Sequence, residues 1–553
     1  MSFYGTIDSI KWFTVWDLIL SALNLFVLIW YAVPIQKYYR WLDFVPSIAL
    51  LGAVISILDG NTSDLSLLIY SWTFLVFICT IKKVFKPSRR ILVPKYRIWR
   101  IIVCIVGVIP LVAALMFAGQ LRYNPVSDLS SLSYSQAFVK MNERLSVEYP
   151  FSDWKKVNWD ALRSKFEPIF QKAEKNQDKA LYYQTLKEYV SSIPDGHVGL
   201  KENKAELKAE IGGGFGITAI RLDDGTILVN KVIKDSPAEQ IGIKVGAEIV
   251  TWDGRDAKEA YNNSGFIVTS LATEQAKMHH QGLLMTRAPI GREVQVAFNN
   301  LNETKTQKVT LQAYDDNFLT LQRENAGQDI IEGQLLSSGY GYLKKINSFQ
   351  KELFATSPEE ILNSKLQAYL DNQMKGLIID VRDNRGGEDQ LVADIARHFV
   401  QEEHFYEITS YYNRYTHKFE LNHNETRTLT PTKPSYNGKI AILINSQTVS
   451  SGEGIPLALK GLPNVKIIGF TPTNGSFGLY TAPITIQLPE GYVVQLPDGR
   501  SLNRNHEIQV DSDFSGKGGV TPDIQIPLTR EMFKAKYVDG IDVELKYAIQ
   551  ALQ

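Results

Sequence analysis

The chain of 553 residues contains very little cysteine and no excess charge of either sign. Its two cysteines, Cys79 and Cys104, are too few for a disulfide scaffold or a multi-cysteine metal site. Lys and Arg together number 59, as do Asp and Glu, so the formal net charge is zero. This balance argues against a protein that binds nucleic acid through bulk electrostatics. With 44% apolar and 21% charged residues, the chain cannot be wholly disordered.

Glutamate is absent from residues 1–120, which carry 11 Lys/Arg and 5 Asp/Glu. Two long apolar runs lie there, Phe13–Val33 and Ile101–Gly119, with the shorter runs Phe44–Leu58 and Leu65–Ile81 between them. Because a helix needs about 20 apolar residues to cross a bilayer, this pattern predicts four transmembrane helices. A cleaved signal peptide is the alternative for the first run, but a basic start and a small-residue cleavage site are missing.

Loop charges predict the orientation of these helices. Residues 82–100 carry eight Lys/Arg and no acid, whereas the loop at residues 59–64 is acidic. Cytoplasmic loops carry the excess of Lys and Arg. We therefore expect an integral, multi-pass protein of the plasma (inner) membrane in contact with the lipid bilayer. Residues after 120 would then lie outside the cytoplasm, and they contain no cysteine for disulfides.

Three regions follow the predicted membrane part. Residues 121–205 show helical spacing of apolar side chains, for example from Tyr182 through Leu186 to Tyr189. Residues 206–315 hold short strand-like runs separated by glycine. Residues 316–553 alternate apolar strands, such as Gly376–Val381 and Ile440–Asn445, with helical segments. Strand–helix–strand order with apolar strands predicts a parallel sheet, and functional groups are expected at the carboxyl ends of its strands.

The glycine-rich stretch Gly212–Ile217 opens the middle region. The strand-like Ile227–Val229, then Ser236–Glu239, then Gly246–Trp252 follow it. This order resembles a PDZ domain of the form found in bacterial proteases. The resemblance implies that the adjacent strand edge pairs with a peptide, and that a peptide carboxylate is bound by backbone N–H groups of Gly214, Phe215, Gly216 and Ile217. A glycine-rich turn of unrelated purpose is the alternative.

Residues that could take part in catalysis lie at the ends of two predicted strands and one predicted helix. Ser450 lies between a buried strand and a helix, where free N–H groups stabilise developing negative charge, although an N-cap serine is a common alternative. Gly386 and Gly387 follow a strand and could supply an oxyanion donor or a tight turn. His197 lies in a loop and could take a proton from a serine, or be an ordinary surface residue.

Together these segments resemble the C-terminal processing peptidase superfamily, which includes tail-specific and tricorn-like peptidases. The resemblance covers roughly residues 134–528 and is most specific in Asp380–Gly387 and Gly519–Ile524. It implies that Ser450 is the nucleophile and His197 the general base. The oxyanion hole would then be the N–H of Ser451 with that of Gly386 or Gly387. The resemblance implies no metal and no organic cofactor.

Two departures from the family pattern concern the catalytic base and its acid. The Ser–Lys branch places its lysine in a Gly-Lys-Gly turn, but Gly469–Gly478 contains none, whereas the tricorn-like branch uses a histidine that His197 matches. That branch also has a glutamate just before Gly-Val-x-Pro-Asp, where this chain reads Ser515–Gly518. The third catalytic member therefore stays open among Asp195, Glu507, Asp511 and Asp513.

The sequence as a whole predicts a multidomain protein. Transmembrane α-helices (1–120) precede a helical subdomain (121–205), a PDZ-like β module (206–315) and an α/β serine peptidase core of crotonase/ClpP-like type (316–553). The expected function is a membrane-anchored serine endopeptidase that cleaves extracytoplasmic proteins or peptides and does not bind nucleic acid. A catalytically inactive homologue that binds peptide or lipid, and a membrane signalling protein, are the alternatives. The sequence does not indicate an oligomeric state.

Overall fold

The computed structural model describes most of the chain after residue 125 and three short stretches before it. It divides the chain into two compact units, Met1–Ser127 with Tyr412–Lys418, and Asp128–Tyr411 with Phe419–Gln553. The described residues are 20–26, 45–58, 69–78, 126–201, 204–265, 271–322, 331–344, 346, 348–349, 358–413 and 417–553.

The first unit contains three described helical stretches, residues 20–26, α3 (Val45–Leu58) and residues 69–78. They pack through a small apolar interior, in which the Asn24 amide donates a hydrogen bond of 2.7 Å to the Thr73 hydroxyl. The same stretches also expose large apolar side chains: Phe26, Ile48, Leu51, Val54, Phe74, Leu75 and Ile78.

The prediction of four transmembrane helices is wrong for the part of the chain that the structure describes. No helix there is both long enough and apolar enough to cross a bilayer. The fourth predicted helix, Ile101–Gly119, and both loops that set the orientation lie outside the described residues.

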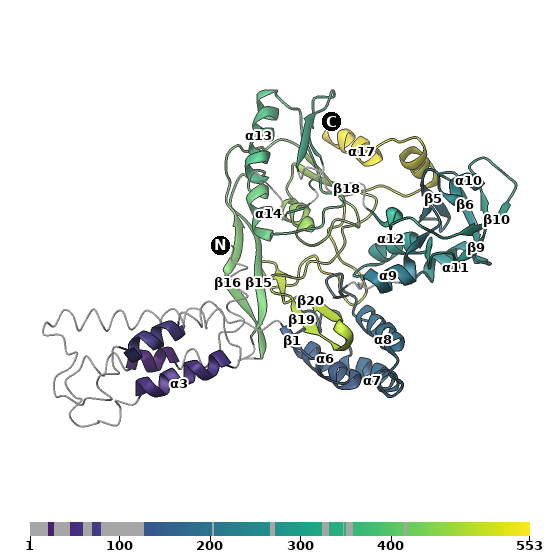
Figure 1. Cartoon of the computed structure of the whole chain (residues 1–553). Helices are drawn as coiled ribbons and strands as arrows, with labels where there is room; N and C mark the ends of the chain where they lie inside the picture. Colours follow the sequence, from purple (N-terminus) through teal and green to yellow (C-terminus); the bar gives the residue numbers. More distant parts are fainter. Residues whose placement is uncertain are drawn as a thin grey trace, which may run out of the picture. The chain divides into compact units, whose positions relative to one another are not determined.

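The second unit begins with three helices that share an aromatic interior, α6 (Tyr134–Glu148), α7 (Trp159–Asn176) and α8 (Lys179–Ser191). Side chains cap two of them, because Asn158 and Asp178 each accept a backbone N–H at 2.9 Å. In Figure 1 these helices lie beside β19 (Ile484–Gln487) and β20 (Val493–Leu496). Those strands form a sheet in the order β1-β19-β20-β2 with β1 (Val126–Asp128) and β2 (Gly199–Leu200).

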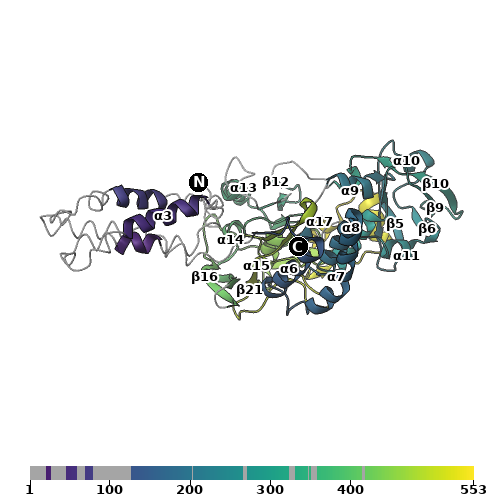
Figure 2. The same cartoon turned by 60° about the horizontal axis from the view of Figure 1, so that its bottom comes forward.

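The middle module is built on a six-stranded antiparallel sheet whose main path runs β10-β9-β6-β5-β4. Figure 2 shows α10 and α11 beside its strands. Its strands are β4 (Ile217–Arg221), β5 (Ile227–Val232), β6 (Glu248–Trp252), β7 (Arg255–Asp256), β9 (Glu293–Asn299) and β10 (Gln307–Gln312). Its helices are α10 (Pro237–Ile241), α11 (Ala257–Asn262) and α12 (Glu274–Leu284). A small sheet, β11-β3-β8, adjoins it with β3 (Gly213–Gly214), β8 (Arg287–Ala288) and β11 (Tyr314–Asp315), and α9 (Lys204–Ile211) precedes it.

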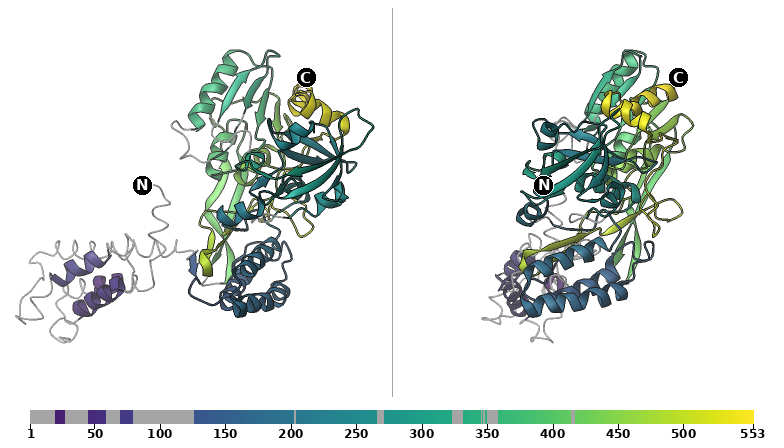
Figure 3. Two further views of the ribbon diagram at one scale, coloured as in Figure 1. Left: turned by 45° about the vertical axis from the view of Figure 1, so that its right-hand side comes forward. Right: turned by 90° about the vertical axis from the view of Figure 1, so that its right-hand side faces the viewer.

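The core sheet has six strands in the order β12-β13-β14-β17-β18-β22, and β13 through β22 run parallel. This confirms the predicted parallel sheet. Its strands are β12 (Glu332–Leu335), β13 (Gly341–Lys344), β14 (Leu377–Asp380), β17 (Ile440–Leu443), β18 (Val465–Gly469) and β22 (Ile524–Gln525). Helices α13 (Pro358–Asp371) and α14 (Asp389–Ala396) cover one face, while α17 (Val543–Leu552) covers the other (Figure 3).

The remaining elements frame this core. The strands β15 (His404–Asn413), β16 (Lys418–Leu429) and β21 (Gly499–Leu502) form a third sheet in the order β16-β15-β21. A short helix α15 (Gly454–Leu459) follows β17, and α16 (Arg530–Phe533) precedes α17. Because β2 comes directly after the loop of His197 and pairs with β20, the sheet fixes where that loop leaves the helical subdomain.

Candidate active site

Ser450 stands in a sharp turn between strand β17 and helix α15. Its φ angle is +58°, in the left-handed region that non-glycine residues rarely adopt. Ser450 is the first residue of a short 3-10 helix, Ser450–Glu453, whose N-cap is Val449, and Glu453 is the N-cap of α15. The Ser450 N–H donates to the carbonyl of Ser476 at 3.0 Å. The turn therefore holds the serine by its backbone and leaves its hydroxyl uninvolved in capping.

His197 follows α8 in a loop that is fixed by a buried carboxylate. Asp195 accepts the His197 N–H at 2.8 Å and the Tyr149 hydroxyl at 2.7 Å. The imidazole stacks on Tyr480 with ring centroids 5.7 Å apart, and its Nδ1 is buried without a hydrogen-bond partner. Burial lowers the pKa of His197, and nearby carboxylates oppose that effect. The ring is therefore neutral near pH 7 and able to accept a proton.

The residues 473–477, which we call the hub segment, lie between these two groups. Ser476 accepts the Ser450 N–H through its carbonyl. The backbone of Gly196, next to His197, approaches the Ser476 side chain so closely that a Cβ on Gly196 would overlap its Oγ. Among the described residues no hydrogen bond joins the Ser450 hydroxyl to His197. Catalytic hydrogen bonds are often loose before substrate binds.

A buried glutamate holds the hub segment against the start of α15. Glu453 is fully buried. It accepts the N–H of Gly475 at 2.9 Å and of Ser476 at 3.0 Å, and it is bonded to the Thr473 hydroxyl. Burial raises its pKa to about 8, against the lowering effect of these donors. Sequence reasoning missed Glu453, although an acid placed three residues after a candidate nucleophile, in an apolar setting, was a usable signal.

The two glycines after β14 differ in the use of their N–H groups. Gly386, at φ +86°, donates its N–H to Asn384 at 2.8 Å, so that donor is occupied. The N–H groups of Gly387 and Ser451 donate no hydrogen bond within the residues that the structure describes. The Ser451 hydroxyl donates to the Gly387 carbonyl at 2.9 Å, which keeps those two amides close together beside Ser450. This pair can stabilise an oxyanion.

Part of the chain matches a known protein family. Residues 339–526, which include the core sheet and the turn of Ser450, match the family model described as Peptidase family S41. This part of the chain is therefore similar to peptidases of that family.

Sequence relatives match parts of this chain. Carboxy-terminal processing protease CtpB of Bacillus subtilis (strain 168) is 24% identical over 346 residues, which are 62% of this chain and 58% of that protein. The alignment thus spans less than two thirds of CtpB. The Nisin-resistance protein of Lactococcus lactis subsp. lactis is 31% identical over 163 residues, 28% of this chain and 47% of that protein.

A solved structure of mature CPAF complexed with lactacystin is similar in fold to this chain. The TM-score is 0.56 at 15% identity, covering 76% of this chain and 99% of that one.

Four acids were predicted as candidates for the third catalytic residue, and none of them forms a hydrogen bond with the imidazole ring of His197. Both carboxylate oxygens of Asp195 are occupied by the His197 backbone and Tyr149. Asp511 forms a buried ion pair of 2.7 Å with Lys155. Glu507 bonds to Asn503, and Asp513 bonds to the turn at Ser515. Asp389, at the start of α14, is the additional acid that acts electrostatically on His197.

The four residues predicted to bind a peptide carboxylate lie inside the middle module. Gly214, Phe215, Gly216 and Ile217 are all buried. Helix α12 lies against the outer edge of β4, where a Cβ added at Gly282 would overlap the Ala219 carbonyl oxygen. Among the described residues of this chain, no group of three or more His, Cys, Asp or Glu side chains could hold a metal ion.

Replacing Gly386 by alanine tests how closely the turn at Gly386 approaches Ser450. A Cβ there would lie 2.7 Å from the Ser450 Cβ and 2.9 Å from the Ser451 nitrogen. We expect Gly386→Ala to reduce peptide hydrolysis at least tenfold, about 1.4 kcal/mol in the barrier, because the turn must shift. Hydrolysis rate and free energy of unfolding are measured together.

Gly461→Ala is the matched control for this substitution. Gly461 has a φ of +87°, and nothing lies within 4 Å of an added Cβ. It should lower the free energy of unfolding by about 1 kcal/mol from backbone strain alone and leave hydrolysis unchanged. Equal rates for Gly386→Ala and Gly461→Ala would contradict the close approach.

Proposed function

We propose that the chain is a serine endopeptidase that hydrolyses peptide bonds of protein substrates, with Ser450 as nucleophile and His197 as general base. The observation that carries the proposal is the shared hub segment. Ser476 binds the Ser450 backbone on one side and touches the His197 loop on the other. Two unpaired amides, of Gly387 and Ser451, lie beside the same serine.

The chemistry follows from these positions. The Ser450 Oγ attacks the substrate carbonyl carbon while its proton passes to the neutral His197 ring, and the N–H groups of Gly387 and Ser451 stabilise the oxyanion. The C–N bond then breaks, and the imidazolium gives its proton to the departing amine. Water, deprotonated by His197, hydrolyses the acyl-enzyme and restores the Ser450 hydroxyl.

Labelling with a serine-reactive phosphonate tests this assignment. We expect the wild type to be labelled, whereas Ser450→Ala and His197→Ala, with unchanged circular dichroism, should be neither labelled nor active. Ser515→Ala, at an exposed serine, is the control that keeps both properties. Full turnover by Ser450→Ala would contradict the assignment. Peptide binding without labelling of the wild type would favour an inactive homologue. The buried Nδ1 of His197, which has no hydrogen-bond partner among the described residues, also favours it.

We further propose that the PDZ-like module regulates the site through α12. One end of this helix covers the edge of β4, where a peptide strand would add. At the other end, its N-cap Thr273 donates to the Asn474 carbonyl at 3.0 Å, in the hub segment. A peptide that pairs with β4 must displace α12 and break the bond from Thr273 to Asn474. The hub segment, still held by Glu453, Asp511 and Ser512, could then shift so that Ser450 and His197 approach each other.

Thr273→Val tests this regulation because valine keeps the shape and removes the hydroxyl. Losing one hydrogen bond of about 1 kcal/mol should raise basal hydrolysis of a short reporter peptide roughly fivefold. It should also weaken stimulation by a non-cleavable tail peptide. Thr310→Val, at an exposed position of β10, should behave like the wild type. Wild-type hydrolysis that no tail peptide stimulates, or an unchanged basal rate in Thr273→Val, would contradict the proposed regulation.

The exposed apolar side chains of the first unit support a proposed association with a lipid bilayer. Leu51 is 61% exposed and Phe74 is 52% exposed, and apolar surface of this kind is typical of a contact with membrane or protein. In vesicle co-sedimentation of the full chain, Leu51→Ser combined with Phe74→Ser should reduce binding several-fold. Phe514→Ser, at a 57% exposed residue of the second unit, is the control. Equal binding by both variants would contradict a role for these side chains.

A further inference from the structure

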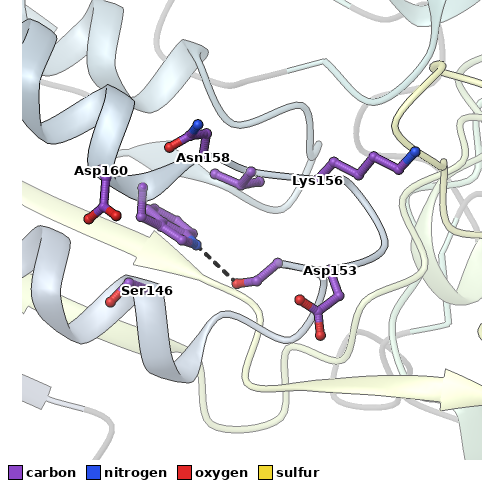
Figure 4. Close-up of a pocket in the computed structure, with 8 residues that line it drawn as sticks. Ser146, Asp153, Lys156, Asn158 and Asp160 are labelled. Atoms are coloured by element: carbon purple, nitrogen blue, oxygen red, sulfur yellow. Dashed lines mark hydrogen bonds between the residues drawn. The ribbon is translucent and has the colours of Figure 1, made fainter.

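Two adjacent lysines between α6 and α7 have opposite environments. Lys155 is 4% exposed, whereas Lys156 is exposed and its Nζ lies 3.5 Å from the ring centroid of Phe514. Figure 4 shows Lys156 at an open pocket of about 560 Å³, extending away from Asp160 and Ser146. A buried lysine is costly unless its charge is paired, so the partners of Lys155 indicate its role.

The ammonium group of Lys155 has three acceptors within hydrogen-bond distance. Its Nζ lies 2.7 Å from Asp511 Oδ1, 2.8 Å from the Ser512 carbonyl and 2.7 Å from the Ser512 hydroxyl. A protonated amine has three N–H donors and no acceptor, so these contacts fit the charged form. Lys155 is therefore not a general base, although the chain has no lysine at the family's usual position in Gly469–Gly478.

Both partners of Lys155 bind the hub segment on either side of Ser476. The second carboxylate oxygen of Asp511 accepts the Phe477 N–H at 2.9 Å. The Ser512 N–H donates to the Gly475 carbonyl at 2.9 Å. The residues before and after Ser476 are thus both held by groups that Lys155 holds in turn.

Lys155 also acts on His197 through its charge. The charged groups that face the imidazole are Asp195 and Asp389, which favour its protonated form, and Lys155, which disfavours it. The ring of Tyr480 stacks on it and carries no charge in its usual form. Asp511 also faces Asp195 and Lys155. The one positive group in this set is therefore the ammonium of Lys155.

We propose that Lys155 is a positioning residue for the Ser450–His197 pair, because it holds the hub segment through Asp511 and Ser512. This inference rests on the proposed function. Removing the ammonium should raise the pKa of His197, since one opposing charge is lost. Lys155 also lowers the pKa of Asp511, which burial raises to about 6. Without it, the pKa of Asp511 should rise further, and the protonated carboxyl should hold the Phe477 N–H less firmly.

The test measures the phosphonate labelling rate of the full chain between pH 5 and 9, with thermal unfolding alongside. Lys156→Met is the matched control and should follow the wild type. Lys155→Met should label at least tenfold more slowly at pH 7. The acid limb of its rate profile should move to higher pH, because a base with a raised pKa stays protonated over a wider range, and the rate should recover partly above pH 8. Lys155→Arg keeps the charge and should restore the wild-type limb.

A structural role alone would lower the unfolding temperature of Lys155→Met and leave its acid limb unmoved, and that result overturns the inference. If Lys155→Met does not fold, the labelling rate of Ser512→Ala tests the inference instead. It removes one acceptor without burying a lone charge, so labelling should slow several-fold across the whole pH range, and a wild-type rate would overturn the inference. Absent labelling of the wild type itself would overturn the proposed function, and this inference with it.

Discussion

The hydrogen bond from the Ser450 N–H to the Ser476 carbonyl is the contact around which the site is arranged. It fixes a serine with a left-handed backbone against residues 473–477, which four distant parts of the chain hold in place. These are the start of α15, the loop after α8, the residues around Asp511, and the N-terminus of α12. Ser450 and His197, the proposed nucleophile and base, therefore share a support although 253 positions separate them in the sequence.

The hub segment is held by buried charged side chains, and each of these requires compensating partners. Glu453, Asp511 and Lys155 are all removed from solvent, which is costly for each group unless donors or an opposite charge compensate. Their partners are mostly backbone N–H and C=O groups of the hub segment and its neighbours. A change in that backbone would leave a buried charge without compensation. The same interactions that stabilise the fold therefore also restrict the positions of Ser450 and His197.

The parallel core sheet and the turn of Ser450 could be predicted because strand, turn and helix follow one another in sequence. The supporting residues could not. Lys155 and Lys156 are indistinguishable in a sequence, and only packing by residues 511–514 separates the buried one from the exposed one. Gly386 and Gly387 also look alike, but Asn384 occupies one N–H. Counting apolar residues predicted spanning helices in the first unit, but no helix among the described residues is long and apolar enough to cross a bilayer.

The most direct test of the central claim is a crystal structure of the full chain with a phosphonate bound covalently to Ser450. The adduct mimics the tetrahedral intermediate of peptide hydrolysis. The account predicts an imidazole nitrogen of His197 within hydrogen-bond distance of the Ser450 Oγ, a phosphonyl oxygen between the amides of Gly387 and Ser451, and an intact bond from Ser450 to Ser476. An adduct in which His197 stays apart from Ser450 while another group contacts the Oγ would contradict it.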